Sequence, residues 1–341
     1  MATASKRGWV LMRLSALLAL CGIAAAIGFG YLGHLHPALD SFSHFRVHLA
    51  AMALLASPLL LILRFRIESA GALILGAAVI AQTTGLPTMP RSGATSAEAA
   101  GEDEALGPSY RLLHLNLRYD NRSPGAVLSL IGTLKPDVIT LNDVSASWVE
   151  TLKLTEATYR YRVVCPQPSH VGGVAILSRR PFSEAVEASC ADRGSFAHAR
   201  LDIGGREIDV ATLHLAWPWP FEQAWQVARV TDLLGGLRDT AIIAGDLNAV
   251  PWSRTARAVA AAAGARILRG IGPTWLSFRL PEFFRPLIGL PIDNVMLKGG
   301  VVALSARTHA AVGSDHLPVV VDFMLLPQET PATVLQASFG E

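Results

Sequence analysis

The stretch GSDHLPVVVDF, residues 313–323, joins an acid and an imidazole to an apolar run. The three valines at 319–321 are β-branched and predict a buried strand, with Asp315 and His316 just before it. A single pair of this kind is explained by a polar turn, because Asp and Ser side chains hydrogen-bond to nearby backbone in turns. Its meaning therefore depends on what the other strands carry at their ends.

Polar side chains occur at the ends of most other apolar runs as well. The runs that predict strands are residues 110–117, 138–141, 174–177, 207–215, 241–244, 291–297 and 317–325. The polar residues at or beside their ends are Asn116, Asn142, Asp143, His214, Asp246, Asn248, Asp293, Asp315 and His316. Loops at one edge of an α/β sheet are where sites are assembled. The repeated pattern therefore indicates one shared site.

Helical patterns separate these runs and predict a single α/β domain over residues 109–326. The amphipathic stretches are residues 126–134, 146–156, 221–237 and 253–263. Mixed strands and helices without an internal repeat favour one domain over two. Basic and acidic residues nearly balance within it, so the basic stripe of a strong nucleic-acid binder is absent from the sequence.

The residue types at the strand ends suit the hydrolysis of a phosphate ester. Carboxylates and carboxamides are hard oxygen ligands that fit Mg²⁺ or Mn²⁺, and the chain has only three cysteines for a soft-metal site. An imidazole paired with a carboxylate can accept or donate a proton, and a divalent ion neutralises phosphate charge.

Three motifs in a fixed order resemble one known superfamily. GDLNAVPWS at 245–253, IDN at 292–294 and GSDHLP at 313–318 resemble the endonuclease/exonuclease/phosphatase superfamily. That group includes pancreatic deoxyribonuclease, apurinic endonucleases, sphingomyelinases and inositol polyphosphate phosphatases. The resemblance spans about residues 111–323. It implies a four-layer α/β sandwich, with two mixed β-sheets flanked by helices.

The resemblance also implies roles for individual side chains. The metal ligands would be Asn116, Asp143 and Asp315, and the catalytic residues His214, Asp246, Asn248, Asp293 and His316. Phosphate contacts would come from Asn116, His214 and Asn248. Arg179, beside Ser178 in the ILSR turn near the site of relatives, would either join these contacts or, the favoured alternative, have a structural role. His316 would be oriented by Asp293, and family members differ on whether this His or the GDLN Asp takes the proton from water.

Two positions depart from the family pattern. Leu-Gln-Glu of the family is Leu141-Asn142-Asp143 here, so the metal carboxylate is one methylene shorter and must shift or bind through water. Ile-Asp-His is Ile292-Asp293-Asn294, which keeps the acid and loses a neighbouring imidazole. The shortened carboxylate is the main support for an alternative: a catalytically weak binding or scaffolding module that keeps the fold.

The N-terminal third of the chain is apolar and predicts a membrane anchor over residues 1–89. Stretches at 14–32, 47–63 and 70–86 are each about as long as a membrane-crossing helix, which predicts three transmembrane helices. A cleaved signal peptide is the alternative for the first stretch. Three spans before such a domain resemble bacterial membrane-anchored members of the superfamily. Residues 90–108 predict a flexible linker and residues 327–341 a C-terminal tail.

Basic residues set the expected orientation in the membrane. Arg13 flanks the first stretch, and Arg64 and Arg66 lie between the second and third, so the positive-inside bias places both sites in the cytoplasm. The phosphoesterase domain is then expected in the periplasm or outside the cell, on a multi-pass protein of the bacterial inner membrane. If the third stretch did not span, this compartment would reverse.

The cysteines and the substrate remain open at the level of sequence. Cys165 and Cys190 flank a predicted strand and turn, so that either a disulfide closing this hairpin or two free thiols is compatible with the sequence. The substrate is a nucleic acid, a phospholipid head group or a soluble phosphate ester, since a fold does not choose among them. The sequence implies contact with the lipid bilayer and no obligate protein partner.

Overall fold

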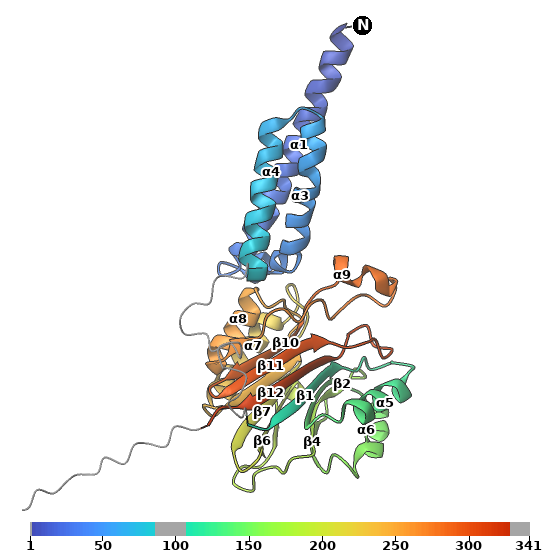
Figure 1. The fold of residues 1–341 in the computed structure, drawn as a ribbon, viewed down its shortest axis with the longest axis vertical. Helices are drawn as coiled ribbons and strands as arrows, with labels where there is room; N and C mark the ends of the chain where they lie inside the picture. The colour runs from blue at the N-terminus through green and yellow to red at the C-terminus, as the bar shows by residue number, and fades with distance from the viewer. Residues whose placement is uncertain (1, 86–106, 328–341) are drawn as a thin grey trace, which may run out of the picture.

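The computed structural model describes residues 2–85 and 107–327, and within them the strands form two six-stranded sheets. The first sheet contains, in spatial order, β11 (Val301–Thr308), β12 (Val319–Leu325), β1 (Ser109–Asn116), β2 (Val138–Val144), β4 (Gly173–Ser178) and β3 (Tyr161–Cys165). The second contains β5 (Ser189–Ala191), β6 (Phe196–Asp202), β7 (Glu207–Leu213), β8 (Ala241–Asp246), β10 (Asp293–Lys298) and β9 (Arg266–Ile267). Figure 1 shows these strands below a bundle of N-terminal helices.

Three hydrophobic clusters arrange the domain in layers. One cluster lies between the sheets, and includes Leu112 and Ile176 of the first sheet and Val210 and Ile242 of the second. The outer face of the first sheet packs on α5 (Pro124–Leu134) and α6 (Ala146–Leu152). The outer face of the second packs on α7 (Gln223–Gly235) and α8 (Arg254–Ala263). This confirms the predicted α/β sandwich of two mixed sheets flanked by helices.

Short helical turns complete the described domain. They are η4 (Lys153–Thr155), η5 (Asp192–Gly194), η6 (Glu282–Phe284) and α9 (Arg285–Ile288). The predicted linker, residues 90–108, and tail, residues 327–341, lie outside the described residues except for 107, 108 and 327.

Strand direction brings the predicted polar ends to one edge of the sandwich. β1 and β2 are parallel, as are β7 and β8, and each pair is connected through a helix on the outer face. The carboxyl ends of all four strands therefore point the same way. β10 runs antiparallel to β8, and β12 antiparallel to β1, so these two strands begin where the other four end. Asp293, for example, is paired directly with Asp246 across the second sheet.

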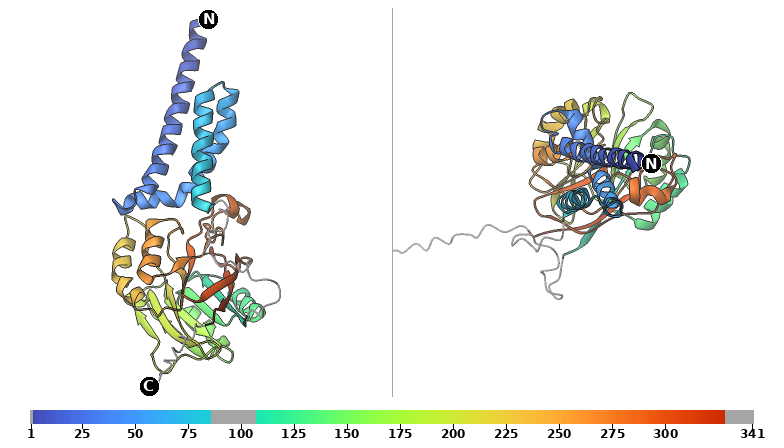
Figure 2. Two further views of the ribbon diagram at one scale, coloured as in Figure 1. Left: turned by 60° about the vertical axis from the view of Figure 1, so that its left-hand side comes forward. Right: turned by 90° about the horizontal axis from the view of Figure 1, so that it is seen from above.

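The N-terminal helices stand together on the end of the domain that carries this edge. The chain runs through α1 (Ala2–Tyr31) toward the domain, crosses its surface as α2 (Pro37–Ser41) and η1 (Phe42–Phe45), and turns away in α3 (Arg46–Ile62). It then returns along α3 in α4 (Arg66–Ile80) and a π-helical turn, η2 (Ala81–Gly85). Figure 2 shows the same bundle from two further directions.

The expectation of three membrane-crossing helices is corrected to two candidates among the described residues. The segments long and apolar enough to cross a bilayer are Gly8–Tyr31 and Pro37–Ile62. The third predicted stretch, residues 70–86, is helical, but its α-helix has 15 residues and ends at Ile80. The polar residues Gln82 and Thr83 follow this helix in a π-helical turn, so its α-helical part is shorter than the roughly 20 residues that cross a bilayer. Residue 86 lies outside the described residues.

The segment between α1 and α3, residues 37–45, is joined to the domain by partly buried polar contacts, and we call it the docking segment. The carboxylate of Asp40 accepts hydrogen bonds from the backbone nitrogens of Arg254 (2.7 Å) and Thr255 (2.9 Å), at the start of α8. Trp252 Nε1 donates to Ser43 O at 2.8 Å. Negatively charged acceptors are favoured at a helix N-terminus, so Asp40 attaches the N-terminal helices to the domain through α8.

Cys165 and Cys190 form a disulfide with a Cα–Cα distance of 5.4 Å. The sequence was compatible with a disulfide that closes a hairpin or with two free thiols. The observed bridge does not close a hairpin. Cys165 ends β3, at one edge of the first sheet, whereas Cys190 lies in β5, at one edge of the second. The disulfide therefore links the two sheets.

Candidate active site

A cleft of about 310 Å³ opens at the edge where the strand ends meet. The predicted residues that line it are Asn116, Asp143, His214, Asp246, Asn248, Asp315 and His316. Asp293 lies beneath it, fully buried and bonded to His316. Two parallel β–α–β units and two antiparallel strands thus bring together side chains up to 200 residues apart in the chain (Asn116 and His316).

Arg179 does not belong to this group. Arg179 follows β4, which is antiparallel to β2. The end of β4 therefore lies beside Val138, at the start of β2 and away from the strand ends that form the cleft. There the guanidinium of Arg179 pairs with Asp137 at 3.1 Å, and Ser178 donates to backbone carbonyls. The structure therefore gives Arg179 a structural contact and no place in the cleft.

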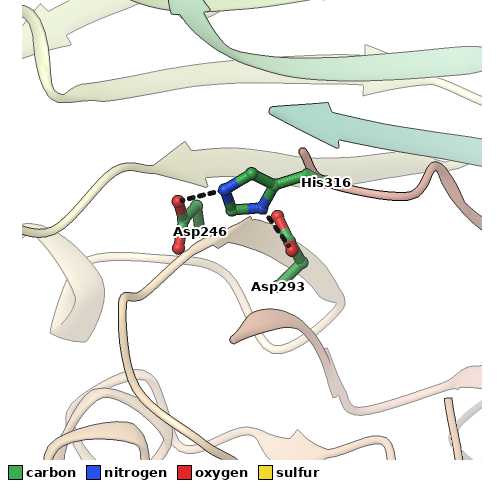
Figure 3. Close-up of side chains that lie close together, drawn as sticks. All are labelled: Asp246, Asp293 and His316. Atoms are coloured by element: carbon green, nitrogen blue, oxygen red, sulfur yellow. Dashed lines mark hydrogen bonds and ion pairs between the residues drawn. The ribbon is translucent and has the colours of Figure 1, made fainter. Parts of the chain in front are cut away.

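His316 and Asp293 form a buried pair at the base of the cleft (Figure 3). His316 Nδ1 lies 2.8 Å from Asp293 Oδ2, and its Nε2 lies 3.6 Å from Asp246 Oδ2. Burial alone would lower the pKa of His316, but the carboxylates of Asp293 and Asp246 outweigh burial and raise it to about 10. The imidazole is therefore a cation at neutral pH, held between two acids.

Asp293 has a second imidazole partner that the sequence analysis missed. His114 Nε2 lies 3.3 Å from Asp293 Oδ1, and His114 Nδ1 lies 3.0 Å from Thr140 Oγ1. Burial raises the pKa of Asp293, but His316 and His114 outweigh it and hold the pKa far below its usual value. The signal for His114 was present in the sequence as a lone polar residue inside an apolar strand, LLHLN, where it could only be buried.

Asp246 is the point on which the polar groups converge. Its Oδ2 accepts a hydrogen bond from Asn116 Nδ2 at 3.0 Å, and its Oδ1 accepts one from Asn248 N at 2.8 Å. The Nε2 atom of His214 lies 3.7 Å from Oδ2, close to the distance of His316 Nε2 from the same atom. Burial, opposed by His316 and reinforced by Asp293, raises the pKa of Asp246.

Two amides hold this carboxylate and its neighbours in place. Asn142, at the end of β2, accepts a hydrogen bond from Asp246 N at 2.7 Å through its Oδ1, and donates to Thr212 Oγ1 at 3.2 Å. Asn142 thereby ties the first sheet to the second directly beneath the cleft. Asn248 has a left-handed backbone, φ 46°, and its Nδ2 donates to Leu215 O at 2.8 Å.

Asp143 is displaced from its strand toward the cleft. The pairing of β2 with β4 shifts register between Leu141 and Val144, and Asp143 has a left-handed backbone with φ 56°. A β-bulge of this kind redirects a side chain at a functional edge. Gly172, which lies against this bulge with φ 88°, is required because a Cβ there would be 2.2 Å from Val144 C. The bulge gives the short Asp143 side chain a backbone position nearer the cleft.

The surroundings of Asp143 fit a divalent cation. Its buried Oδ1 lies 3.3 Å from His214 Nδ1 and accepts no hydrogen bond from any described residue. Burial, opposed by His214 and reinforced by Asp246 and Asp315, raises the pKa of Asp143. Asp315 lies on the same cleft and accepts a hydrogen bond from Trp275 Nε1 at 3.2 Å. Carboxylates that line one cleft are suitable ligands for a hard divalent cation, which would also reduce the repulsion between their charges.

Distance alone points to another cluster, which suits a cation less well. Among the described residues, candidate ligand atoms of Asp246, Asp293 and His316 lie within 4.8 Å of one another. His316 is itself positively charged and satisfies Asp293, so a metal there would meet a cation rather than a free ligand. The Asp143 side of the cleft is therefore the better place for a metal ion.

The fold is similar to that of several solved structures at low sequence identity. TDP2 of D. rerio, complexed with a single-strand DNA product, has a TM-score of 0.52 at 17% identity, covering 63% of this chain and 99% of that one. The human Nocturnin catalytic domain with bound sulfate has a TM-score of 0.50 at 17% identity, covering 65% and 96%. A Bacteroides vulgatus endonuclease/exonuclease/phosphatase has 0.50 at 16% identity, covering 64% and 100%. Likeness at this level establishes the fold alone.

No curated protein matches the chain in sequence. A family model does match, over residues 113–316, and its description is the Endonuclease/Exonuclease/phosphatase family. That span contains all the cleft residues described above, from Asn116 to His316. The chain therefore belongs to the Endonuclease/Exonuclease/phosphatase family.

Proposed function

We propose that the chain is a divalent-metal-dependent phosphoric ester hydrolase whose cleft binds the scissile phosphate. The observation that carries the proposal is the approach of two imidazole nitrogens, from His214 and His316, to the same carboxylate oxygen of Asp246. Hydrolysis needs a hydrogen-bond donor to a phosphate oxygen beside a proton acceptor for the attacking water. The imidazoles can be the donors, and the carboxylate of Asp246 can be the acceptor.

Each group has a place in the reaction. Asp246, with its raised pKa, accepts a proton from water as the water oxygen forms its bond to phosphorus. The bond between phosphorus and the ester oxygen breaks, and the leaving oxygen takes a proton from His316, which Asp293 keeps protonated. His214 and Asn248 donate hydrogen bonds to the non-bridging oxygens. Asp293 touches no substrate and acts by positioning His316.

Asp143 and Asp315, with the amide of Asn116, would hold Mg²⁺ or Mn²⁺. A bound ion of this kind neutralises phosphate charge and polarises the phosphorus. The buried Oδ1 of Asp143 supports this assignment. It accepts no hydrogen bond from any described residue, although His214 Nδ1 lies 3.3 Å away, and a cation would recover part of the free-energy cost of its burial.

We further propose that the N-terminal helices anchor the protein in a bilayer with the cleft on the side away from the cytoplasm. Although α4 is too short to count as a candidate span, it returns along α3 to the domain, so the α3–α4 turn lies at the end of the bundle remote from the domain. Arg64 lies in this turn, and Arg66 begins α4. Arg13 pairs with Glu68 in the first turn of α4, so the positive-inside bias expects the cytoplasm at this end. The inter-sheet disulfide is compatible with an oxidising periplasm. In a bacterium this is a multi-pass protein of the inner membrane with a periplasmic domain.

Hydrolysis of bis(p-nitrophenyl) phosphate by the full chain in detergent tests the activity. We expect turnover with Mg²⁺ or Mn²⁺ and its loss when EDTA is added. A chain that turns over neither this ester, nor DNA, nor phospholipid with either metal is instead a binding or scaffolding module with the same fold. A phosphatase-type reporter fused after Gly107 tests the orientation, since it is active only outside the cytoplasm.

A further inference from the structure

A second hollow, of about 240 Å³, opens beside the cleft and is lined mainly by apolar side chains. We call it the apolar groove, and its large apolar side chains include Phe45, Trp217, Trp219, Phe221, Trp275 and Leu290. Trp217, Trp275 and Asn248 line both the groove and the cleft. The rings of Trp217 and Trp275 pack edge to face, with their centroids 6.2 Å apart, in the wall that the two hollows share. A ligand bound in one can therefore extend into the other.

One wall of the groove is the docking segment, which also contacts the catalytic residue Asn248. Ser41, His44 and Phe45 line the groove. His44 is buried, and its Nε2 lies 3.1 Å from Asn248 O. Together with the bonds from Asp40 to α8, this contact holds the wall against the domain. The groove is therefore a fixed feature of the whole chain and would be incomplete in an isolated domain.

The groove lies where the bilayer surface is expected. The docking segment forms the beginning of the second candidate span, Pro37–Ile62, and lies at the domain end of the bundle, between α1 and α3. Phe45 and Trp219 are each 53% exposed although both are large and apolar. Aromatic side chains exposed next to a membrane-crossing helix are typical of the interface between lipid and water.

We propose that the apolar groove binds the hydrocarbon chain of a membrane lipid whose phosphate ester lies in the cleft. This inference rests on the phosphoesterase activity proposed above and names its substrate class. The charged cleft takes the phosphate, and the groove takes the adjoining apolar chain at the level of the bilayer. The lipid reaches the site from the membrane in which the same chain is anchored.

The charges of the cleft favour a lipid over a nucleic acid. A strand of nucleic acid carries a phosphate at every nucleotide and is bound by basic side chains along its path. The cleft is bordered by Asp120, Asp143 and Asp315, with Arg118 engaged by Asp120 at 2.7 Å. The groove beside it offers rings and aliphatic side chains rather than cations. One phosphate with an apolar extension fits both hollows.

Alkyl p-nitrophenyl phosphates test the groove without changing the reacting centre. The full chain in detergent is given the methyl and the octyl ester with Mg²⁺ or Mn²⁺, at one detergent concentration. Because each buried methylene contributes a few-fold in binding, we expect kcat/KM for the octyl ester to exceed that for the methyl ester by at least about tenfold. Vesicles of phosphatidylethanolamine and phosphatidylglycerol, and a single-stranded DNA oligonucleotide, are compared in parallel.

Two variants separate the groove from the catalytic residues. The double variant Phe45→Ala with Trp219→Ala removes two exposed side chains of the groove, and Trp225→Ala removes an equally large ring, 73% exposed on α7, that lines neither hollow. We expect the double variant to lower the octyl-to-methyl ratio at least fivefold and to hydrolyse the methyl ester within twofold of the unmodified chain. Trp225→Ala should leave both values unchanged.

The outcomes distinguish the two proposals. No hydrolysis of the methyl ester by the unmodified chain contradicts the phosphoesterase activity itself. Hydrolysis of the methyl ester with an octyl-to-methyl ratio near one, or with a ratio that the double variant leaves unchanged, overturns the lipid inference alone. Faster cleavage of the oligonucleotide than of vesicle lipid, unaffected by Phe45→Ala with Trp219→Ala, assigns the site to nucleic acid and also overturns it.

Discussion

His316 Nδ1 and Asp293 Oδ2 lie 2.8 Å apart at the base of the cleft, and both side chains are buried. Asp293→Asn removes the charge that keeps His316 protonated, so we expect kcat to fall by about 10²- to 10⁴-fold, the range for loss of general acid–base catalysis. His316→Gln should lose as much, and the double variant little more, because the two act as a unit. Rates with bis(p-nitrophenyl) phosphate measure this. His309→Gln, outside the cleft, serves as the control, and additive losses would contradict the pairing.

Asp143 is expected to lower the stability of the metal-free protein and to bind the metal ion when it is present. In metal-free protein, Asp143→Asn removes one of several neighbouring buried carboxylates, so we expect its melting temperature to rise by a few degrees. With Mg²⁺ the unmodified chain should gain more stability than the variant, because ligand binding stabilises the folded state. Thermal unfolding with and without Mg²⁺ measures both effects. An equal Mg²⁺ shift in the two proteins would remove Asp143 from the metal site.

Asp40 should contribute to stability through α8. Asp40→Ala leaves the amides of Arg254 and Thr255 without their acceptors, and we expect the free energy of unfolding to fall by about 2 to 3 kcal/mol. Asp40→Asn keeps an acceptor and should cost less. Asp232→Ala, exposed on α7, is the matched control. Denaturant unfolding of the full chain measures the difference, and equal values for Asp40→Ala and Asp232→Ala would exclude the role.

Asp209 makes stability depend on pH at a site remote from the cleft. Burial raises its pKa, but the imidazole of His198, 3.2 Å away, and hydrogen bonds from Arg200 and the backbone nitrogen of Arg238 outweigh burial and hold the pKa far below its usual value. A lowered folded pKa gives stability that is present above the unfolded pKa, about 4, and is lost as pH falls toward the folded value.

Asp209→Asn should therefore destabilise the chain by about 2 kcal/mol or more at pH 7 and by less at pH 3. The exposed Asp239→Asn is the control and should show little effect at either pH. Unfolding free energies at the two pH values measure this. A cost of Asp209→Asn that is the same at pH 3 and pH 7 would show that the charge of Asp209 has no role.

The three cysteines provide a test of the compartment. Cys21 is free, whereas Cys165 and Cys190 form the bridge between the sheets. Alkylation of the denatured chain should modify one cysteine before reduction and three after it, as measured by intact mass. Opening this 25-residue loop with Cys165→Ser should cost about 3 kcal/mol in the free energy of unfolding. Three alkylated cysteines without reduction, in protein taken directly from cells, would place the domain in a reducing compartment.

Strand prediction succeeded where burial produced a clear pattern. The runs around Leu112, Ile139 and Ile243 are covered on both faces of their sheets, so they are apolar throughout and readable. Strands β3, β6 and β11 were missed, as were the short strands β5 and β9. One face of each of the strands β3, β6 and β11 contacts solvent and charged partners, and carries Arg162, Arg200 and Arg307 respectively. The hydrophobic pattern that predicts a strand is therefore weaker in them.

The residues that line the cleft were predicted more completely than the N-terminal helices. Polar residues in an apolar context have few structural explanations, so Asp246, Asp293 and His316 were identifiable from the chain alone. Arg179 was misplaced because its turn follows an antiparallel strand, and direction is not encoded in the run itself. α4 was counted as a membrane span by its composition, although its α-helical length depends on where the backbone changes to a π-helical turn.

By itself, the sequence determined the class of fold, the family motifs and most of the residues that meet in the cleft, because burial and turn chemistry act on neighbours along the chain. Only the tertiary structure decided which strand ends share an edge, that Asp143 sits on a bulge, and that the disulfide joins two sheets. It also placed the docking segment against Asn248 and formed the apolar groove between them. These relationships join residues that are not neighbours in the chain, from 25 positions apart for the disulfide to 204 for His44 and Asn248, and packing in three dimensions sets them.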